Sequence, residues 1–203
     1  MSSIEEELES KPLEKVITSL YESVRFEREF YLVDSLDLAK KLLGKILVFK
    51  KKRYRIVEVE AYRGANDKGA HTYNNRRTQR TEAMYLEGGH VYIYMIYGMY
   101  YNINVVANVK DNPQGVLLRG IEPLDYEEQK PSTNGPGKLC RHLGIDKSHY
   151  GTDLTLSEDM YIIDDDYEFE VVESKRVNIH YAGEDKDRLW RFYISGSKYV
   201  SKK

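Results

Sequence analysis

Hydrophobic residues recur at helical spacing in only a few stretches of this chain. Residues 1–28 have this pattern at Ile17, Leu20, Tyr21 and Val24, and are expected to form an N-terminal helical extension. Leucine and alanine repeat in the same way over residues 36–43, where Ser35 can cap a helix and Gly44 can end it. A third, short helix is expected after the Gly/Pro turn at residues 134–137, and Gly144 stops it.

Runs of β-branched and aromatic residues predict more strand than helix in the rest of the chain. The strands are expected at residues 45–50, 53–62, 92–101 (a hairpin turning at Gly98), 115–122, 160–163, 167–172, 176–180 and 190–194. No Pro/Gly/Ser-rich linker divides residues 29–203, so one domain is expected. The pattern predicts a mixed α+β fold, a mostly antiparallel sheet with peripheral helices.

Two segments stand out from this pattern. Residues 63–81 are polar and aperiodic, and are expected to form an ordered functional loop. The hairpin at residues 92–101 contains five tyrosines. Stiff aromatic side chains at a turn can wedge between stacked base pairs or stack on a base that has left a helix. About half of these rings are expected to serve packing alone.

Glu58 and Glu60 lie two apart on a predicted strand and therefore share a face. Their strand leads directly into the polar loop that contains His71, and strand ends that feed such loops commonly carry catalytic groups. A carboxylate pair also fits a sugar hydrolase, in which one group is the acid and the other the base or nucleophile. The Cα separation of roughly 6.5–7 Å permits this alternative without favouring it.

Charge and composition limit the partners and the cellular location that are expected for this chain. The chain has a formal net charge of −2, but residues 1–28 hold seven acidic and four basic residues, so the body is almost neutral and can still present a local basic face. The single cysteine, Cys140, excludes an internal disulfide. No membrane span or secretory signal is apparent, and an intracellular protein is expected.

Cofactors are not expected. The five histidines fall into no metal-ligand spacing, the lone cysteine excludes a thiolate cluster, and no glycine-rich phosphate loop follows a strand.

Several blocks, taken in order, resemble the 3-methyladenine (alkyladenine) DNA glycosylase family from about Phe30 to Ser201. They are residues 55–62 (RIVEVEAY), 69–71 (GAH), 92–100 (YIYMIYGMY), Asn104, 116–119 and 122–124 (VLLR and EPL), 134–140 (NGPGKLC) and 191–193 (RFY). One such block is a weak signal, but the ordered set is specific. The resemblance implies a single domain at residues 29–203 around a curved antiparallel sheet with a protruding hairpin.

The resemblance also implies roles for individual residues. Glu60 matches the glutamate that activates the attacking water, and Arg119 matches an arginine that helps hold this water, together with the backbone carbonyl at Val177. The residues that match the pocket for an extruded base are Tyr62, His71, Tyr94 and Asn104. Those that match the duplex-filling hairpin tip are Tyr97, Met99 and Tyr100. In addition, the basic residues expected to contact the DNA backbone are Arg76, Arg77 and Arg80.

The implied activity is monofunctional. Alkylated or deaminated purines in double-stranded DNA (3-methyladenine, 7-methylguanine, hypoxanthine, ethenoadenine) would be flipped and released by hydrolysis, without metal or cofactor and by a monomer. The acidic extension and residues 74–77, which replace a more glycine-rich loop, depart from the family pattern and leave lesion range and duplex affinity open. The alternative is a non-catalytic module that binds damaged DNA or RNA, which would gain nothing from a carboxylate facing the sugar.

Overall fold

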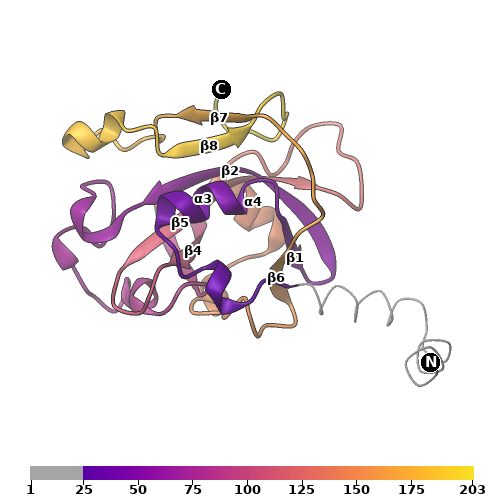
Figure 1. The fold of residues 1–203 in the computed structure, drawn as a ribbon. Coiled ribbons are helices and arrows are strands. Elements are labelled where there is room, and N and C mark those ends of the chain that lie inside the picture. Colours follow the sequence, from indigo (N-terminus) through magenta and orange to yellow (C-terminus); the bar gives the residue numbers. More distant parts are fainter. Residues whose placement is uncertain (1–24) are drawn as a thin grey trace, which may run out of the picture.

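The computed structural model describes residues 25–203, and within them eight strands form one antiparallel sheet (Figure 1). The strands are β1 (Ile46–Phe49), β2 (Lys52–Tyr62), β3 (Val91–Ile96), β4 (Tyr100–Ala107), β5 (Gln114–Pro123), β6 (Met160–Ile163), β7 (Val171–Ser174) and β8 (Arg191–Ile194). Their main order is β3-β4-β5-β2-β1-β6, and β8 joins β2 while β7 pairs with β8. The expected mixed α+β fold around a curved antiparallel sheet is confirmed.

The long strand β2 organises this sheet. One edge pairs with β5 along most of its length. The other edge is shared, because β1 pairs with its first half and β8 pairs with Glu58–Glu60. The C-terminal β7–β8 pair therefore lies alongside the part of β2 that carries the two glutamates, as the strands above β2 in Figure 1 show.

Two helices pack against the same core. Leu38 and Leu42 of α3 (Ser35–Leu42) and Leu139 of α4 (Pro136–Leu143) are fully buried in one cluster with residues of β2, β4 and β5. The N-cap of α3 is Asp34, whose carboxylate accepts from the Leu36 N–H, so Ser35 is the first helical residue and not the cap as expected. Gly144 ends α4 in the left-handed conformation, as predicted.

Two strand predictions were wrong near the C-terminus. The strand expected at residues 167–172 is β7 at Val171–Ser174, and residues 176–180 form no strand. The reason is local, because Arg176 is buried in an ion pair and the Val177 N–H donates to a side chain instead of to a neighbouring strand. The predicted helix at residues 1–28 lies largely outside the described residues, and Arg28–Phe30 form a short 3₁₀ turn.

The polar segment after β2 contains two 3₁₀ turns, Gly64–Asn66 and Tyr73–Asn75, and a third, Glu82–Tyr85, directly follows it. Asn74 and Asn75 both have positive φ angles, 55° and 56°. Asparagine tolerates this conformation better than other non-glycine residues, which explains how it stands where a glycine-rich loop was expected.

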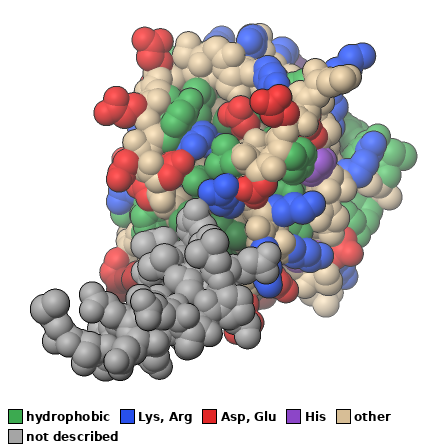
Figure 2. All heavy atoms as spheres, turned by 90° about the vertical axis from the view of Figure 1, so that its right-hand side faces the viewer, with side chains coloured by type: hydrophobic (Ala, Val, Ile, Leu, Met, Phe, Trp, Pro, Cys, Tyr) green, Lys and Arg blue, Asp and Glu red, His purple; other side chains and the backbone are tan. Residues whose placement is uncertain are grey.

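Acidic and basic side chains are interspersed on the face shown in Figure 2. Among residues 25–203, no helix is long and apolar enough to cross a membrane.

Candidate active site

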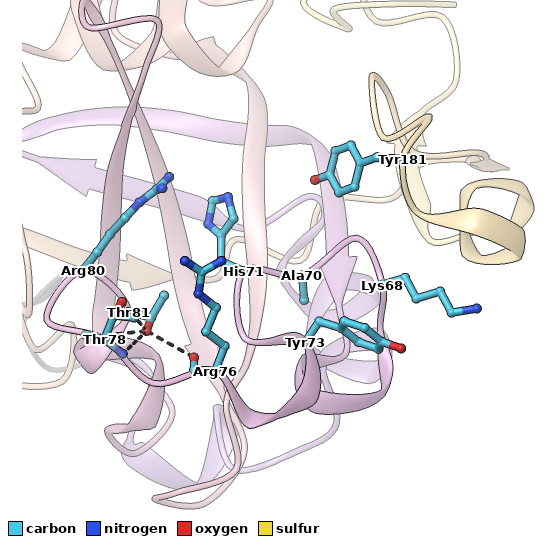
Figure 3. A pocket seen from close by; sticks show the side chains of 9 residues that line it. All are labelled: Lys68, Ala70, His71, Tyr73, Arg76, Thr78, Arg80, Thr81 and Tyr181. Atoms are coloured by element: carbon cyan, nitrogen blue, oxygen red, sulfur yellow. Dashed lines mark hydrogen bonds between the residues drawn. The ribbon is translucent and has the colours of Figure 1, made fainter.

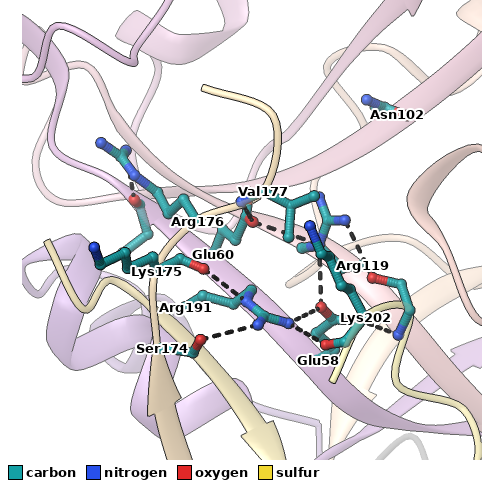
Figure 4. Close-up of polar contacts among 12 residues, drawn as sticks. Glu58, Glu60, Asn102, Arg119, Ser174, Lys175, Arg176, Val177, Arg191 and Lys202 are labelled. Carbon is teal, nitrogen blue, oxygen red and sulfur yellow. Dashed lines mark hydrogen bonds and ion pairs between the residues drawn. The ribbon is translucent and has the colours of Figure 1, made fainter. Parts of the chain in front are cut away.

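The two glutamates of β2 lie side by side and are completely buried. The register of β2 against β5 shifts around Glu58, and Arg119 is the extra residue on β5 at this bulge. At this bulge the Arg119 side chain lies against both carboxylates (Figure 4). Its Nε is 3.2 Å from Glu58 Oε1 and 3.5 Å from Glu60 Oε1. The structure therefore brings the predicted Glu60 and Arg119 together.

Glu60 is held by donors from three directions. The Val177 N–H donates to Oε1 at 2.6 Å, the Tyr62 hydroxyl donates to Oε2 at 2.9 Å, and Arg119 adds its positive charge. Burial raises the pKa of Glu60 above its ordinary value, whereas Arg119 and the two hydrogen bonds oppose the rise. A carboxylate with a raised pKa is a stronger base than an exposed one, so Glu60 is suited to accept a proton.

Glu58 has a different role. Its Oε1 accepts from Arg119 and from Arg191 Nη1 at 2.8 Å, and its Oε2 accepts from the Ser201 N–H at 2.6 Å. Glu58 and Glu60 are equally buried, but Glu60 hydrogen-bonds Tyr62, which lines an aromatic cavity, whereas none of these partners of Glu58 lines that cavity. Glu60 and not Glu58 therefore adjoins it. Glu58 holds Arg119 beside Glu60, which argues against a sugar hydrolase with two working carboxylates.

A second buried ion pair lies behind Glu60. Arg176 binds Asp67 in a bidentate pair with distances of 2.5 and 2.7 Å, and both side chains are fully buried. The guanidinium also lies 4.6 Å from the ring centre of Tyr62 and 4.9 Å from that of Trp190. This pair connects the loop after β2 to the segment that carries Val177, and so fixes the N–H that Glu60 accepts.

An aromatic pocket opens next to Glu60. The residues that line it are Tyr62, Gly69, Ala70, His71, Met84, Tyr92, Tyr94, Asn104 and Tyr181. His71 and Tyr94 meet edge to face with ring centres 4.6 Å apart, and Tyr92 stacks on Tyr94 at 5.5 Å. The four predicted pocket residues, Tyr62, His71, Tyr94 and Asn104, thus line one cavity, while Val177 contacts Glu60 through its N–H and does not line this cavity.

His71 is neutral in this setting. Its Nδ1 lies 3.0 Å from the Tyr92 hydroxyl. Burial, with the nearby charges of Arg80 and Arg76, lowers the pKa of His71 to about 4. An uncharged imidazole adds no repulsion of its own toward a positively charged ligand.

The hairpin between β3 and β4 carries the most exposed aromatic side chain of residues 25–203. Tyr97 is 84% exposed and Met99 66% exposed. Tyr97 and Gly98 both have positive φ angles, 52° and 68°, and the Met99 N–H donates to the Ile96 carbonyl. A bulky residue in the left-handed region is strained, and such strain persists where the exposed ring has a use.

Tyr100 is placed differently from the tip. It begins β4 and packs below Arg141, whose guanidinium lies 5.1 Å from the ring centre. A side chain at Gly137 of α4 would approach the Tyr100 ring closely, so α4 packs tightly against the start of β4.

The three loop arginines also differ from one another. Arg76 and Arg80 line an outer cavity of about 440 Å³ that adjoins the aromatic pocket at His71 (Figure 3). Arg77 points elsewhere and forms ion pairs with Glu82 and Asp111 at 2.5 and 2.9 Å. Its charge is therefore partly neutralised, as is that of Lys68, which lies 3.5 Å from Glu184 Oε1, whereas Arg76 and Arg80 line the outer cavity.

Several residues of the site were not predicted from the sequence. They are Asp67, Asn102, Arg176, Tyr181, Arg191 and Ser201. Asn102 lies opposite Tyr94 in the hairpin and donates from Nδ2 to its hydroxyl at 3.0 Å, a contact that the predicted register could have indicated. Within the described part of the chain, no three His, Cys, Asp or Glu side chains are grouped so that they could hold a metal ion.

The site thus defines a class of protein, an enzyme with one desolvated carboxylate base next to an aromatic pocket. Comparison with known proteins gives the family. Residues 29–198 match the family model described as methylpurine-DNA glycosylase. A protein of Clostridium novyi that is named for 3-methyladenine DNA glycosylase activity is 50% identical over 200 residues, which cover 88% of this chain and 99% of that protein. A protein of Clostridium perfringens with the same name is 46% identical, with 89% of this chain and all of that protein covered.

The chain belongs to the methylpurine-DNA glycosylase family. It is a DNA glycosylase, a hydrolase of N-glycosyl bonds that acts in the repair of alkylated purines. The resemblance of the sequence blocks to this family is confirmed.

Proposed function

We propose that this enzyme is a monofunctional glycosylase of base excision repair that flips damaged purines out of duplex DNA and hydrolyses the N-glycosidic bond with water activated by Glu60. The substrates would be 3-methyladenine, 7-methylguanine, hypoxanthine and ethenoadenine, and the enzyme would act as a monomer. The observation that carries this proposal is a fully buried carboxylate that pairs with Arg119 and hydrogen-bonds Tyr62, whose side chain lines the aromatic pocket.

Glu60 would perform the chemistry. An ionised carboxylate at this position can orient a water molecule, accept its proton and stabilise the positive charge that develops on the sugar as the bond to the base lengthens. The hydrogen bonds from Val177 and Tyr62 fix the orientation of the Glu60 carboxylate, and Glu58 fixes the Arg119 side chain. The reacting groups therefore need no rearrangement. The Val177 carbonyl is proposed as a second acceptor for the water.

The pocket would select the base. Alkylation at N3 or N7 gives a purine positive charge, which favours stacking on the tyrosine faces through cation–π attraction and makes the base a better leaving group. The neutral state of His71 supports this preference. Asn104 is 5% exposed and donates from Nδ2 to the Tyr92 carbonyl at 3.3 Å, so its position is fixed. Its bulk would exclude the exocyclic amine of normal guanine.

Two substrates test the proposal directly. The enzyme is expected to release methylated purines from alkylated DNA and to form abasic sites in a duplex with a single hypoxanthine. The strand should stay intact until alkali is added, because water and not a lysine amine is the proposed nucleophile. EDTA should leave the rate unchanged. Binding to both DNAs without base release would favour the alternative, a module that only recognises damage, and a borohydride-trapped protein–DNA adduct would refute the hydrolytic mechanism.

Replacement of Tyr97 by alanine is expected to slow excision from duplex DNA by about tenfold or more. Its exposed ring would fill the space left by the flipped nucleotide and so offset part of the few kcal/mol that unstacking costs. Single-stranded substrate has no stack to refill and should lose much less. Single-turnover rates on matched single-stranded and duplex hypoxanthine substrates measure both effects.

Tyr94→Ala is the control for this experiment, because a pocket residue should affect both substrates. Equal slowing of both substrates by Tyr97→Ala would assign the wedge to another residue of the tip, such as Met99.

A further inference from the structure

Tyr181 lies between the two cavities of the active site. It lines the aromatic pocket together with Tyr62 and Tyr94, and it also lines the outer cavity together with Arg76 and Arg80. It comes from the segment after β7, and Figure 3 shows its ring extending from there toward His71. Tyr181 therefore stands where a ligand would pass from one cavity to the other.

Contacts between two loops fix the position of Tyr181. Its hydroxyl donates to the Gly69 carbonyl at 3.2 Å, two residues before His71. The same two segments are joined by the buried Asp67–Arg176 pair and by the Lys68 N–H, which donates to Asp185 at 3.0 Å. The hydroxyl of Tyr181 and the segment that carries the residue are thus both tied to the loop after β2.

The ring itself is poorly packed. Tyr181 is 68% exposed, and among residues 25–203 no other aromatic ring stacks on it. An exposed aromatic face at the mouth of a pocket is available to a ligand, and its burial on binding would be favourable.

We infer that Tyr181 is the outer wall of the base pocket, and that its ring contacts the flipped purine and favours positively charged lesions. The inference rests on the proposed function. A third tyrosine face, in addition to Tyr62 and Tyr94, adds cation–π attraction for an N-alkylated purine and only stacking for a neutral one such as hypoxanthine. Tyr181 would then set how strongly the enzyme distinguishes charged from neutral damage.

The contribution of the Tyr181 ring to lesion binding can be measured in a variant that binds DNA but does not release the base. Tyr181 is replaced by alanine or phenylalanine in the Glu60→Gln background, and affinity is measured for duplexes with one 7-methylguanine, one hypoxanthine or no lesion. The alanine variant is expected to bind the 7-methylguanine duplex roughly fivefold more weakly and the hypoxanthine duplex about twofold more weakly, with the undamaged duplex unchanged. The phenylalanine variant keeps the ring and should retain most of the preference.

Tyr73→Ala is the matched control, since Tyr73 lines the outer cavity but not the aromatic pocket. It should not change the ratio of the two lesion affinities. Equal losses on damaged and undamaged DNA for Tyr181→Ala would show a backbone contact instead, and an equal loss in the phenylalanine variant would assign the effect to the hydroxyl. Either result, or no loss, overturns the inference. Failure of the wild-type enzyme to release any base would instead refute the proposed function.

Discussion

Glu60→Gln is expected to lower the single-turnover rate of base excision by about a thousandfold or more while lesion binding survives. General base catalysis by a positioned side chain contributes on the order of 10²–10⁴ in rate, and Glu60 would also stabilise charge on the sugar. Glutamine keeps the shape of the side chain but cannot accept the proton from water. Excision rates and gel-shift affinities for the same lesion duplex would be measured together.

The melting temperature of the Glu60→Gln variant is the control that shows whether it is folded. Because burial raises the pKa of Glu60, its ionised form costs folding free energy at any pH above that pKa. The glutamine variant should therefore melt at a temperature no lower than that of the wild type at neutral pH. Excision within tenfold of the wild type, in a protein that melts normally, would remove Glu60 from the mechanism.

Asp67→Ala is expected to destabilise the protein by about 3–5 kcal/mol, because it leaves the Arg176 guanidinium buried without its counter-charge. Arginine cannot escape this cost by losing its proton. Excision should fall as well, since Arg176 holds the segment that presents the Val177 N–H to Glu60. Urea unfolding measures the stability, and the excision rate is measured under conditions where the variant is folded.

A second ion pair on the same segment is the matched control. Lys175 and Asp187 are 2.7 Å apart, but their side chains are 61% and 56% exposed. Asp187→Ala should therefore cost less than about 1 kcal/mol. If Asp67→Ala costs as little as Asp187→Ala, the buried pair does not hold the site together.

The sequence predicted the parts of the site that lie on regular elements. Glu58 and Glu60 share a face because strands alternate, and the tyrosine hairpin turns at Gly98 as the sequence pattern indicates. The strand pattern alone did not distinguish the two glutamates, and only the resemblance to the family assigned the catalytic role to Glu60. In the structure the two glutamates differ in their partners, because Arg191 and Ser201 reach Glu58 from 133 and 143 residues away along the chain.

The remaining errors have the same cause. A local pattern of apolar residues predicted a strand at residues 176–180, yet Arg176 pairs with Asp67 across 109 residues of sequence, and Val177 bonds Glu60 across 117. No local signal reports such contacts, because tertiary interactions override propensity at these positions. Tyr181 was missed for the same reason, since its partner Gly69 lies 112 residues away.

The pH dependence of excision tests the role of Glu60 most directly. A duplex with one 7-methylguanine is suitable, because this base is already charged and needs no proton to leave. Since the pKa of Glu60 is raised and the ionised form is the active base, the wild-type single-turnover rate should rise about tenfold per pH unit below that pKa and level off above it. The small residual rate of Glu60→Gln should not change with pH. A wild-type rate that is flat over the same range, or a Glu60→Gln profile with the same rise, would contradict the assignment of Glu60 as the general base.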